Sequence, residues 1–137
     1  ISGDTSAGGL ARLPALLVEH KPDVVIVEVG GNDGLRGQLP AQLKQNLAGM
    51  IDASQQAGAK VLLLGMQLPP NYGARYTQAF AAVYAELGKE KNVALVPFFL
   101  EGVGGKTELM QADRIHPAVG AQGLLLDNVW PALKPLL

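Results

Sequence analysis

Three short apolar runs, separated by segments of helical periodicity, constrain the fold of this chain more than any other feature. They cover residues 23–29, 60–66 and 93–99. The first run is almost continuously apolar, which is typical of a parallel strand covered on both faces. Strands that alternate with helices favour a parallel sheet with right-handed crossover connections. The sequence therefore predicts an α/β fold.

The first two helices carry clear boundary signals. One is expected over residues 8–20, where Pro14 should bend the helix or delay its start. Its apolar stripe consists of Leu10, Leu13, Leu16 and Leu17. In the next helix, Pro40 suits the first turn and Gly58 suits the end. The apolar positions of that helix are Leu43, Leu47, Met50 and Ile51.

Two more helices are expected in the second half of the chain. The clearest amphipathic pattern consists of Tyr76, Phe80, Val83, Tyr84 and Leu87. After the third strand, residues 100–117 are expected to form a long irregular connection. A final helix should cover about residues 118–130 and end near Pro131.

Composition excludes several classes of function. The 137 residues, of which 48% are hydrophobic and 17% charged, suit one globular domain. Eleven Lys and Arg stand against twelve Asp and Glu without a basic cluster, so nucleic acid is not an expected partner. The lack of cysteine excludes disulfides, cysteine-ligated zinc and thiol catalysis. No apolar run approaches the roughly 20 residues that a membrane-spanning helix needs.

Asp113 and His116, in the segment Asp-Arg-Ile-His-Pro, suit a catalytic base and the residue that orients it. The carboxylate would accept a hydrogen bond from one ring nitrogen and fix the tautomer. The other nitrogen would take a proton from a hydroxyl. The spacing alone also occurs by chance, so an incidental pair on a surface loop stays the alternative.

The segment Gly30-Gly31-Asn32-Asp33 directly follows the first predicted strand. Ligands of parallel sheets bind at the carboxyl ends of the strands, and the Asn32 amide could donate to an oxyanion there. Taken alone, the motif favours an ordinary turn, since Gly, Asn and Asp are common turn residues. Near the start of the chain, the backbone N–H of Gly3 could face a ligand, while Thr5 or Ser6 could simply cap a helix.

Gly104-Gly105-Lys106-Thr107 resembles the end of a phosphate-binding loop. Such a loop requires a glycine at position 100, where this chain has Leu100. Nucleotide binding is therefore a weak alternative.

Three blocks in this order resemble the SGNH (GDSL-like) hydrolases: residues 1–6, residues 30–33 and residues 113–117. The likeness is closest to the bacterial periplasmic acyl-CoA thioesterase I, lysophospholipase and arylesterase group, and it covers essentially the whole chain. It implies a flavodoxin-like three-layer α/β/α domain over residues 1–137 that needs no metal or cofactor. It also implies a periplasmic or secreted protein, monomeric when full length.

The resemblance assigns roles to individual residues. His116 would be the general base, and Asp113 would orient it. The oxyanion hole would receive the backbone N–H of Gly3 and the side-chain amide of Asn32. Residues 34–39 would form the mobile segment beside the acyl site. The substrate site would include Gly31, Leu35, Leu68 and Pro69.

The nucleophile block of this family, G-D-S-[LS], does not occur in the sequence. Ser2 and Ser6 lie in the second block and Ser54 lies within a helix, so none of them suits the nucleophile. We expect the chain to lack roughly 40 residues before Ile1, including a strand–helix–strand unit and any export signal. The domain over 1–137 is thus expected to be incomplete at its N-terminus.

The implied activity is that of a serine hydrolase acting on small acyl esters or thioesters through an acyl-enzyme, in the full-length protein. Residues 1–137 alone are expected to be inactive and poorly soluble, because strand 23–29 would lie bare at one edge of the sheet. The alternatives are a non-catalytic relic or fragment that binds acyl ligands and, less favoured, a P-loop nucleotide-binding protein.

Overall fold

The computed structural model describes residues 5–96 and 122–137, whose strands form a parallel sheet. The sheet order is β1-β2-β3, and both neighbouring pairs run parallel. The strands are β1 (Val24–Val27), β2 (Lys60–Leu64) and β3 (Ala94–Val96). The predicted α/β class and parallel sheet are confirmed.

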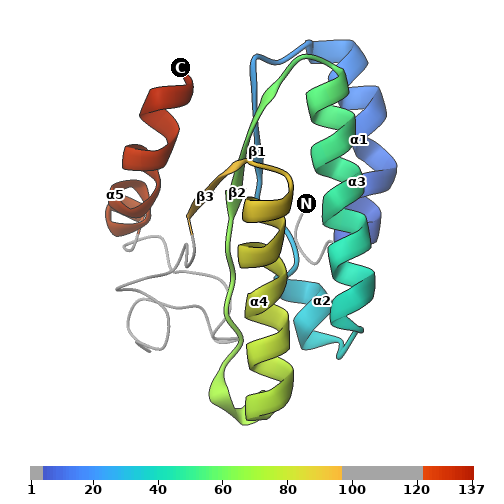
Figure 1. Cartoon of the computed structure of the whole chain (residues 1–137), viewed down its shortest axis with the longest axis vertical. Coiled ribbons are helices and arrows are strands. Elements are labelled where there is room, and N and C mark those ends of the chain that lie inside the picture. Colours follow the sequence, from blue (N-terminus) through green and yellow to red (C-terminus); the bar gives the residue numbers. More distant parts are fainter. Residues whose placement is uncertain (1–4, 97–121) are drawn as a thin grey trace.

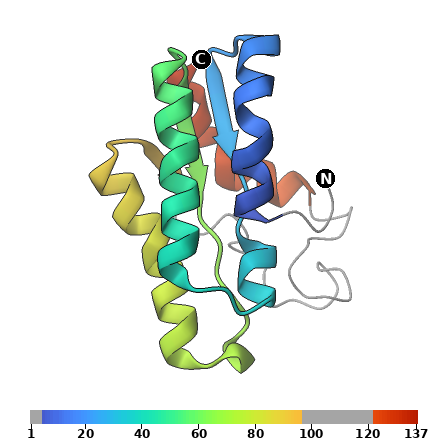
Figure 2. The ribbon, with the colours of Figure 1, turned by 90° about the vertical axis from the view of Figure 1, so that its right-hand side faces the viewer.

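Helices lie on both faces of the sheet and produce three layers (Figure 1). One layer consists of α1 (Ser6–His20), α3 (Pro40–Gln56) and α4 (Ala74–Glu90). Figure 2 shows α3 between α1 and α4, with the strands behind them. On the opposite face lies α5 (Gln122–Leu133), which contacts β3 and β2. The expected α/β/α layering is present.

Local signals explain where α1 begins and ends. Thr5 is the N-cap, and its Oγ1 accepts a hydrogen bond from the backbone N of Gly8 at 3.4 Å. Lys21, with φ 45°, terminates the helix and donates its backbone N–H to Leu17. Pro14 lies inside α1, which begins at Ser6, so Pro14 does not delay the start of the helix. The alternative expectation, a bend at Pro14, stays a prediction.

The apolar stripes predicted for the helices mostly face the core. In α3 and α4, eight of the nine predicted apolar positions are buried, and Tyr76 is partly buried and packs against the core. In α1, Leu17 is buried, and Leu10 and Leu13 pack against the core. Leu16, however, is 45% exposed, because it lies one position away from the stripe that Leu10, Leu13 and Leu17 define.

The strands are shorter than the apolar runs that predicted them. β1 ends at Val27, and Ile26 on this strand is 45% exposed. Within the described residues, β1 pairs only with β2 and is therefore an edge strand. The face that carries Ile26 lacks the predicted cover, whereas Val27 on the other face is buried. β2 is the central strand, and its residues Val61 to Leu64 are buried. Residues 97–99 of the third predicted strand lie outside the described part of the chain.

The C-terminal helix differs from its predicted bounds. Pro131 lies inside α5, which continues to Leu133 and is followed by η4 (Lys134–Leu136). A proline removes one helical hydrogen bond without necessarily ending the helix, so α5 continues two residues beyond the predicted end near Pro131. The irregular connection predicted over 100–117 lies outside the described residues. None of the helices described is long and apolar enough to span a membrane.

Candidate active site

The predicted site segment lies beyond the carboxyl end of β1. The chain leaves β1, passes Gly30 and forms the short helix α2 (Gly31–Leu35), which Figure 1 shows below the first turn of α1. Asn32 is therefore the second residue of a helix rather than part of an open turn. Its side chain is partly exposed, whereas Gly31 and Asp33 on either side are buried.

A buried carboxylate joins this segment to the start of α1. Asp33 is 1% exposed and Ser6 is fully buried. Asp33 Oδ1 accepts a hydrogen bond from the backbone N of Ser6 at 2.7 Å, and Asp33 Oδ2 accepts one from Ser6 Oγ at 2.5 Å. From α3, Asn46 Nδ2 donates to Ser6 Oγ at 3.0 Å. The three side chains thus tie α1, α2 and α3 together behind Asn32.

Sequence reasoning did not identify this network. The sequence motif places Asp33 in a turn, and nothing in the motif points to Asn46. One signal was available: Asn46 is a polar residue within the mostly apolar stripe of α3, next to Leu47 and four residues before Met50. A polar residue on a buried helix face requires a hydrogen-bond partner.

A tyrosine from α4 fixes the end of the strand. Tyr84 is 1% exposed, and its hydroxyl donates to the backbone O of Val29 at 2.8 Å. Its ring packs edge-on against Phe80, with centroids 5.8 Å apart. Gly30 adopts φ 122°, and a Cβ at this position would lie 2.0 Å from the Tyr84 hydroxyl oxygen. The site segment therefore leaves β1 through a position that only glycine fits.

The predicted substrate-lining residues occupy different environments. Leu68 is 7% exposed and packs closely on α2, where a Cβ on Gly34 would lie 2.4 Å from Leu68 Cδ2. Leu35 and Pro69 are partly exposed, and Gly31 is buried. Their contact with an acyl chain stays a prediction.

Hydrogen bonds hold the segment over residues 34–39, which the family resemblance implied to be mobile. The Tyr76 hydroxyl donates to the backbone O of Gln38. The backbone N of Gln38 donates to the backbone O of Asp33 at 3.0 Å. Burial, and secondarily the negative charge of Asp33, raise the pKa of Tyr76. Because the phenol stays protonated well above neutral pH, it remains a donor to this segment.

The remaining predicted catalytic residues, His116, Asp113 and Gly3, lie outside the described residues, as do Ser2 and residues 104–107. Ser6 and Ser54 are both fully buried. Ser54 Oγ donates to the backbone O of Met50 at 2.8 Å, while Ser6 is engaged by Asp33. Neither hydroxyl is accessible as a nucleophile. Among the described side chains, no three His, Asp or Glu residues gather as metal ligands.

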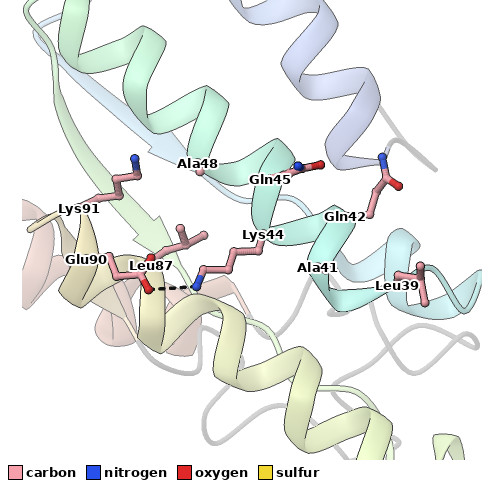
Figure 3. Close-up of a pocket in the computed structure, with 9 residues that line it drawn as sticks. All are labelled: Leu39, Ala41, Gln42, Lys44, Gln45, Ala48, Leu87, Glu90 and Lys91. Carbon is pink, nitrogen blue, oxygen red and sulfur yellow. Dashed lines mark hydrogen bonds and ion pairs between the residues drawn. The ribbon is translucent and has the colours of Figure 1, made fainter.

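A surface groove between α3 and α4 is separate from the predicted site (Figure 3). Lys44 lies across it and contacts Glu86 Oε2 at 2.9 Å and Glu90 Oε1 at 3.0 Å. The hydrogen bonds that Lys44 donates to the carboxylates of Glu86 and then Glu90 raise the pKa of Lys44. The lining residues are Leu39, Ala41, Gln42, Lys44, Gln45, Ala48, Leu87, Glu90 and Lys91. Apart from Leu39, which ends the segment over residues 34–39, none of the predicted site residues lines this groove.

Replacing Tyr84 with phenylalanine should change how stability depends on pH. Burial, and then the charge of Asp33, raise the pKa of Tyr84 above its ordinary value. The folded state therefore favours the neutral phenol, so its contribution is complete below the unfolded-state pKa of about 10 and is lost as the pH rises further. At pH 8, Tyr84→Phe should lower the free energy of unfolding by about 1–2 kcal/mol, because the backbone O of Val29 loses its hydrogen-bond donor.

Urea unfolding of both proteins between pH 8 and pH 11 measures this effect. Above pH 10, the wild type should lose stability faster than the variant, and the gap between them should shrink. A gap that is independent of pH would show that the Tyr84 phenol does not control alkaline stability.

Comparison with known proteins identifies the family. The model of the GDSL-like lipase/acylhydrolase family matches residues 1–122. The chain belongs to this family. The matched range includes all three blocks from which the resemblance was inferred, and that inference is confirmed.

Several curated relatives match over the full 137 residues. Esterase TesA of Pseudomonas aeruginosa is 68% identical, and the chain covers 68% of its length. The thioesterase 1/protease 1/lysophospholipase L1 of Escherichia coli K12 is 51% identical, and the chain covers 66% of it. The chain thus spans about two thirds of these GDSL-like hydrolases.

Solved structures of the family share the fold. The crystal structure of TesA superposes with a TM-score of 0.96 at 68% identity, covering 100% of this chain and 76% of that one. The psychrotrophic esterase EstA from Pseudoalteromonas sp., inhibited by monoethylphosphonate, gives a TM-score of 0.90 at 40% identity. That match covers 98% of this chain and 74% of EstA. The α/β architecture is therefore that of GDSL-like hydrolases.

Proposed function

We propose that the protein containing this chain is a serine hydrolase of small acyl esters or thioesters that acts through an acyl-enzyme. The observation that carries the proposal is the hydrogen-bonded link between Asp33 and Ser6, at 2.7 and 2.5 Å. It joins the segment of Asn32 to the segment that follows Gly3. These two segments are the blocks to which the family resemblance assigned the oxyanion donors.

Asn32 and Gly3 would stabilise the charge that develops during acyl transfer. Asn32 precedes Asp33 directly and keeps a partly exposed side chain at the carboxyl end of β1. Gly3 stands three residues before Ser6 in the sequence, and three extended residues span at most about 11 Å. Both donors could therefore face one carbonyl oxygen. Amide donors aimed at that oxygen stabilise the tetrahedral intermediate.

His116 would act as the base, with Asp113 orienting its ring. The base takes the proton of a serine hydroxyl while the serine oxygen attacks the acyl carbon. The proton then passes to the departing alcohol or thiol. Water, deprotonated by the same imidazole, releases the acid and regenerates the serine. The names of the relatives, esterase and thioesterase, support both classes of leaving group.

The nucleophilic serine would come from residues that precede Ile1 in a longer protein. The curated relatives extend well beyond the matched length, and the two described serines are buried and hydrogen bonded. The inhibition of EstA by a phosphonate supports a reactive serine in this family, because phosphonates mimic the tetrahedral intermediate on that oxygen. A periplasmic or secreted location belongs to the same proposal.

Labelling with a fluorophosphonate probe tests the proposal. Protein that includes the residues encoded before Ile1 should be labelled at one serine and should hydrolyse p-nitrophenyl and acyl-thioester substrates. His116→Ala in that protein should abolish both reactions, because nothing else deprotonates the serine. The isolated 137 residues should show neither.

Two results would overturn this assignment. A longer protein that binds acyl ligands without label or turnover would be the non-catalytic acyl-binding form. Robust turnover by residues 1–137 alone would place the nucleophile within the chain.

A further inference from the structure

The buried carboxylate of Asp33 has no part in the proposed chemistry. It is 1% exposed and is not one of the family's assigned catalytic or oxyanion groups. A buried charge is costly unless it is well hydrogen bonded, and one neutral apolar residue would fill the same space. Because Asp33 directly follows Asn32, we expect this buried carboxylate to have a role at the site.

We propose that Asp33 is a positioning residue for the oxyanion hole, whose carboxylate holds the two donor segments in a fixed relative position. This inference rests on the proposed roles of Asn32 and Gly3. It adds to them the residue that determines their separation.

Both oxygens of the carboxylate contact the same residue. Oδ1 accepts from the Ser6 backbone N and Oδ2 accepts from Ser6 Oγ. Two hydrogen bonds to neighbouring groups determine orientation as well as distance. The backbone bond also places a negative charge at the first turn of α1, where the helix dipole favours it.

The helix that carries Asn32 needs such an attachment. α2 has five residues, too few to be stable without tertiary contacts. Its buried members, Gly31, Asp33 and Gly34, surround a partly exposed Asn32. Of these three, Asp33 alone has a side chain that hydrogen bonds outside the segment. We therefore expect the position of Asn32 to depend on that of Asp33.

The hydrogen-bond directions favour a carboxylate at position 33. Ser6 presents two donors to it, the backbone N–H and the hydroxyl. The acceptor side of that hydroxyl is already occupied by Asn46 Nδ2 at 3.0 Å. With Asn46 donating to Ser6 Oγ, position 33 supplies two acceptors and no donor, as aspartate does. Asparagine at position 33 would satisfy the same groups only if the Asn46 amide turned round and accepted from the Ser6 hydroxyl.

Exchanging the two polar side chains tests this arrangement in the full-length protein. Asp33→Asn presents an amide donor to the Ser6 hydroxyl and should lower kcat about 10–100-fold with little change in KM, because small displacements of oxyanion donors are costly. Asn46→Asp alone places two carboxylates beside one hydroxyl and should also lower kcat. The double variant should recover to within about threefold of wild type, because the hydroxyl can reverse: the new amide donates to Ser6 Oγ, which donates to the new carboxylate.

A second measurement determines whether Asp33 acts through Asn32. In an Asn32→Ala background, Asp33→Asn should lower kcat by less than about threefold further, since the donor that it positions is gone. If Asp33→Asn does not fold, Ser6→Ala can take its place in this measurement, because it removes only one hydrogen bond to the carboxylate. It should lower kcat about tenfold and should show the same loss of effect without Asn32. Ser54→Ala is the matched control: it removes another fully buried serine hydroxyl, from α3, and should leave kcat unchanged.

The outcomes separate the two proposals. If Asn32→Ala retains its turnover, Asn32 is not an oxyanion donor and the role of Asp33 falls with it. If Asn32→Ala is impaired but the Asp33→Asn effect is absent, additive or not restored by the exchange, this inference alone is wrong. An unaltered melting temperature in the impaired variants would further support positioning over general destabilisation.

Discussion

Asn32→Ala should lower kcat of the full-length hydrolase about 10²–10³-fold, which is the loss measured when one oxyanion donor is removed from other acyl-transfer enzymes. The amide would donate to the oxygen of the tetrahedral intermediate and only weakly to the ground-state carbonyl. The loss should therefore appear in kcat rather than in KM. Stability should change less than turnover does, since Asn32 is partly exposed rather than buried in the core.

The isosteric variant Asn32→Asp separates hydrogen-bond donation from shape. A carboxylate cannot donate and would repel the developing negative charge, so this variant should be at least as impaired as Asn32→Ala. Steady-state kinetics with a p-nitrophenyl ester, together with thermal melting of each variant, provide the measurement. An Asn32→Ala enzyme that keeps most of its turnover would remove Asn32 from the oxyanion hole.

The fold was largely predictable because burial and periodicity agree in this chain. The apolar positions of α3 and α4 recur at helical spacing and face one side of a buried central strand. Strand ends were less predictable, because hydrogen-bond pairing rather than hydrophobicity defines them. Val29 is apolar, yet its backbone O accepts from the Tyr84 hydroxyl after β1 has ended.

For the candidate site, the sequence predicts the edge of the sheet on which it lies but not the contacts within it. Chain order places Asn32 after β1, at the carboxyl end where parallel sheets bind ligands. The network behind it joins Ser6 to Asp33 across 27 residues and to Asn46 across 40 residues. No local pattern encodes contacts of that separation. They follow from the packing of α1 against α3.

Gly30→Ala should destabilise the fold by about 2–6 kcal/mol, a large fraction of the roughly 5–15 kcal/mol that stabilises a typical domain. Two separate costs arise at this position. With φ 122°, the backbone lies where side-chain-bearing residues are strained, which alone costs about 1–3 kcal/mol. The added Cβ would also lie 2.0 Å from the Tyr84 hydroxyl oxygen, so one of the two groups must move.

The Tyr84 side chain cannot move away without losing contacts. Its ring is 1% exposed, and its hydroxyl is bonded to the residue before Gly30. Moving the ring would break that bond and disturb its packing on Phe80. Overpacking a close-packed core in this way typically costs about 1–3 kcal/mol beyond the backbone strain.

Gly58→Ala and Tyr84→Phe distinguish the two costs. Gly58 has φ 85°, and a Cβ at this position would have no atom within 4 Å, so Gly58→Ala should show backbone strain alone. Combining Gly30→Ala with Tyr84→Phe removes the hydroxyl that the methyl group meets and leaves the ring carbon Cζ at 3.3 Å. The double variant should therefore be more stable than the sum of the two single effects predicts. Urea unfolding of the wild type, the two single variants and the double variant measures this coupling, and strictly additive effects would mean that the Tyr84 hydroxyl is not what excludes a side chain at position 30.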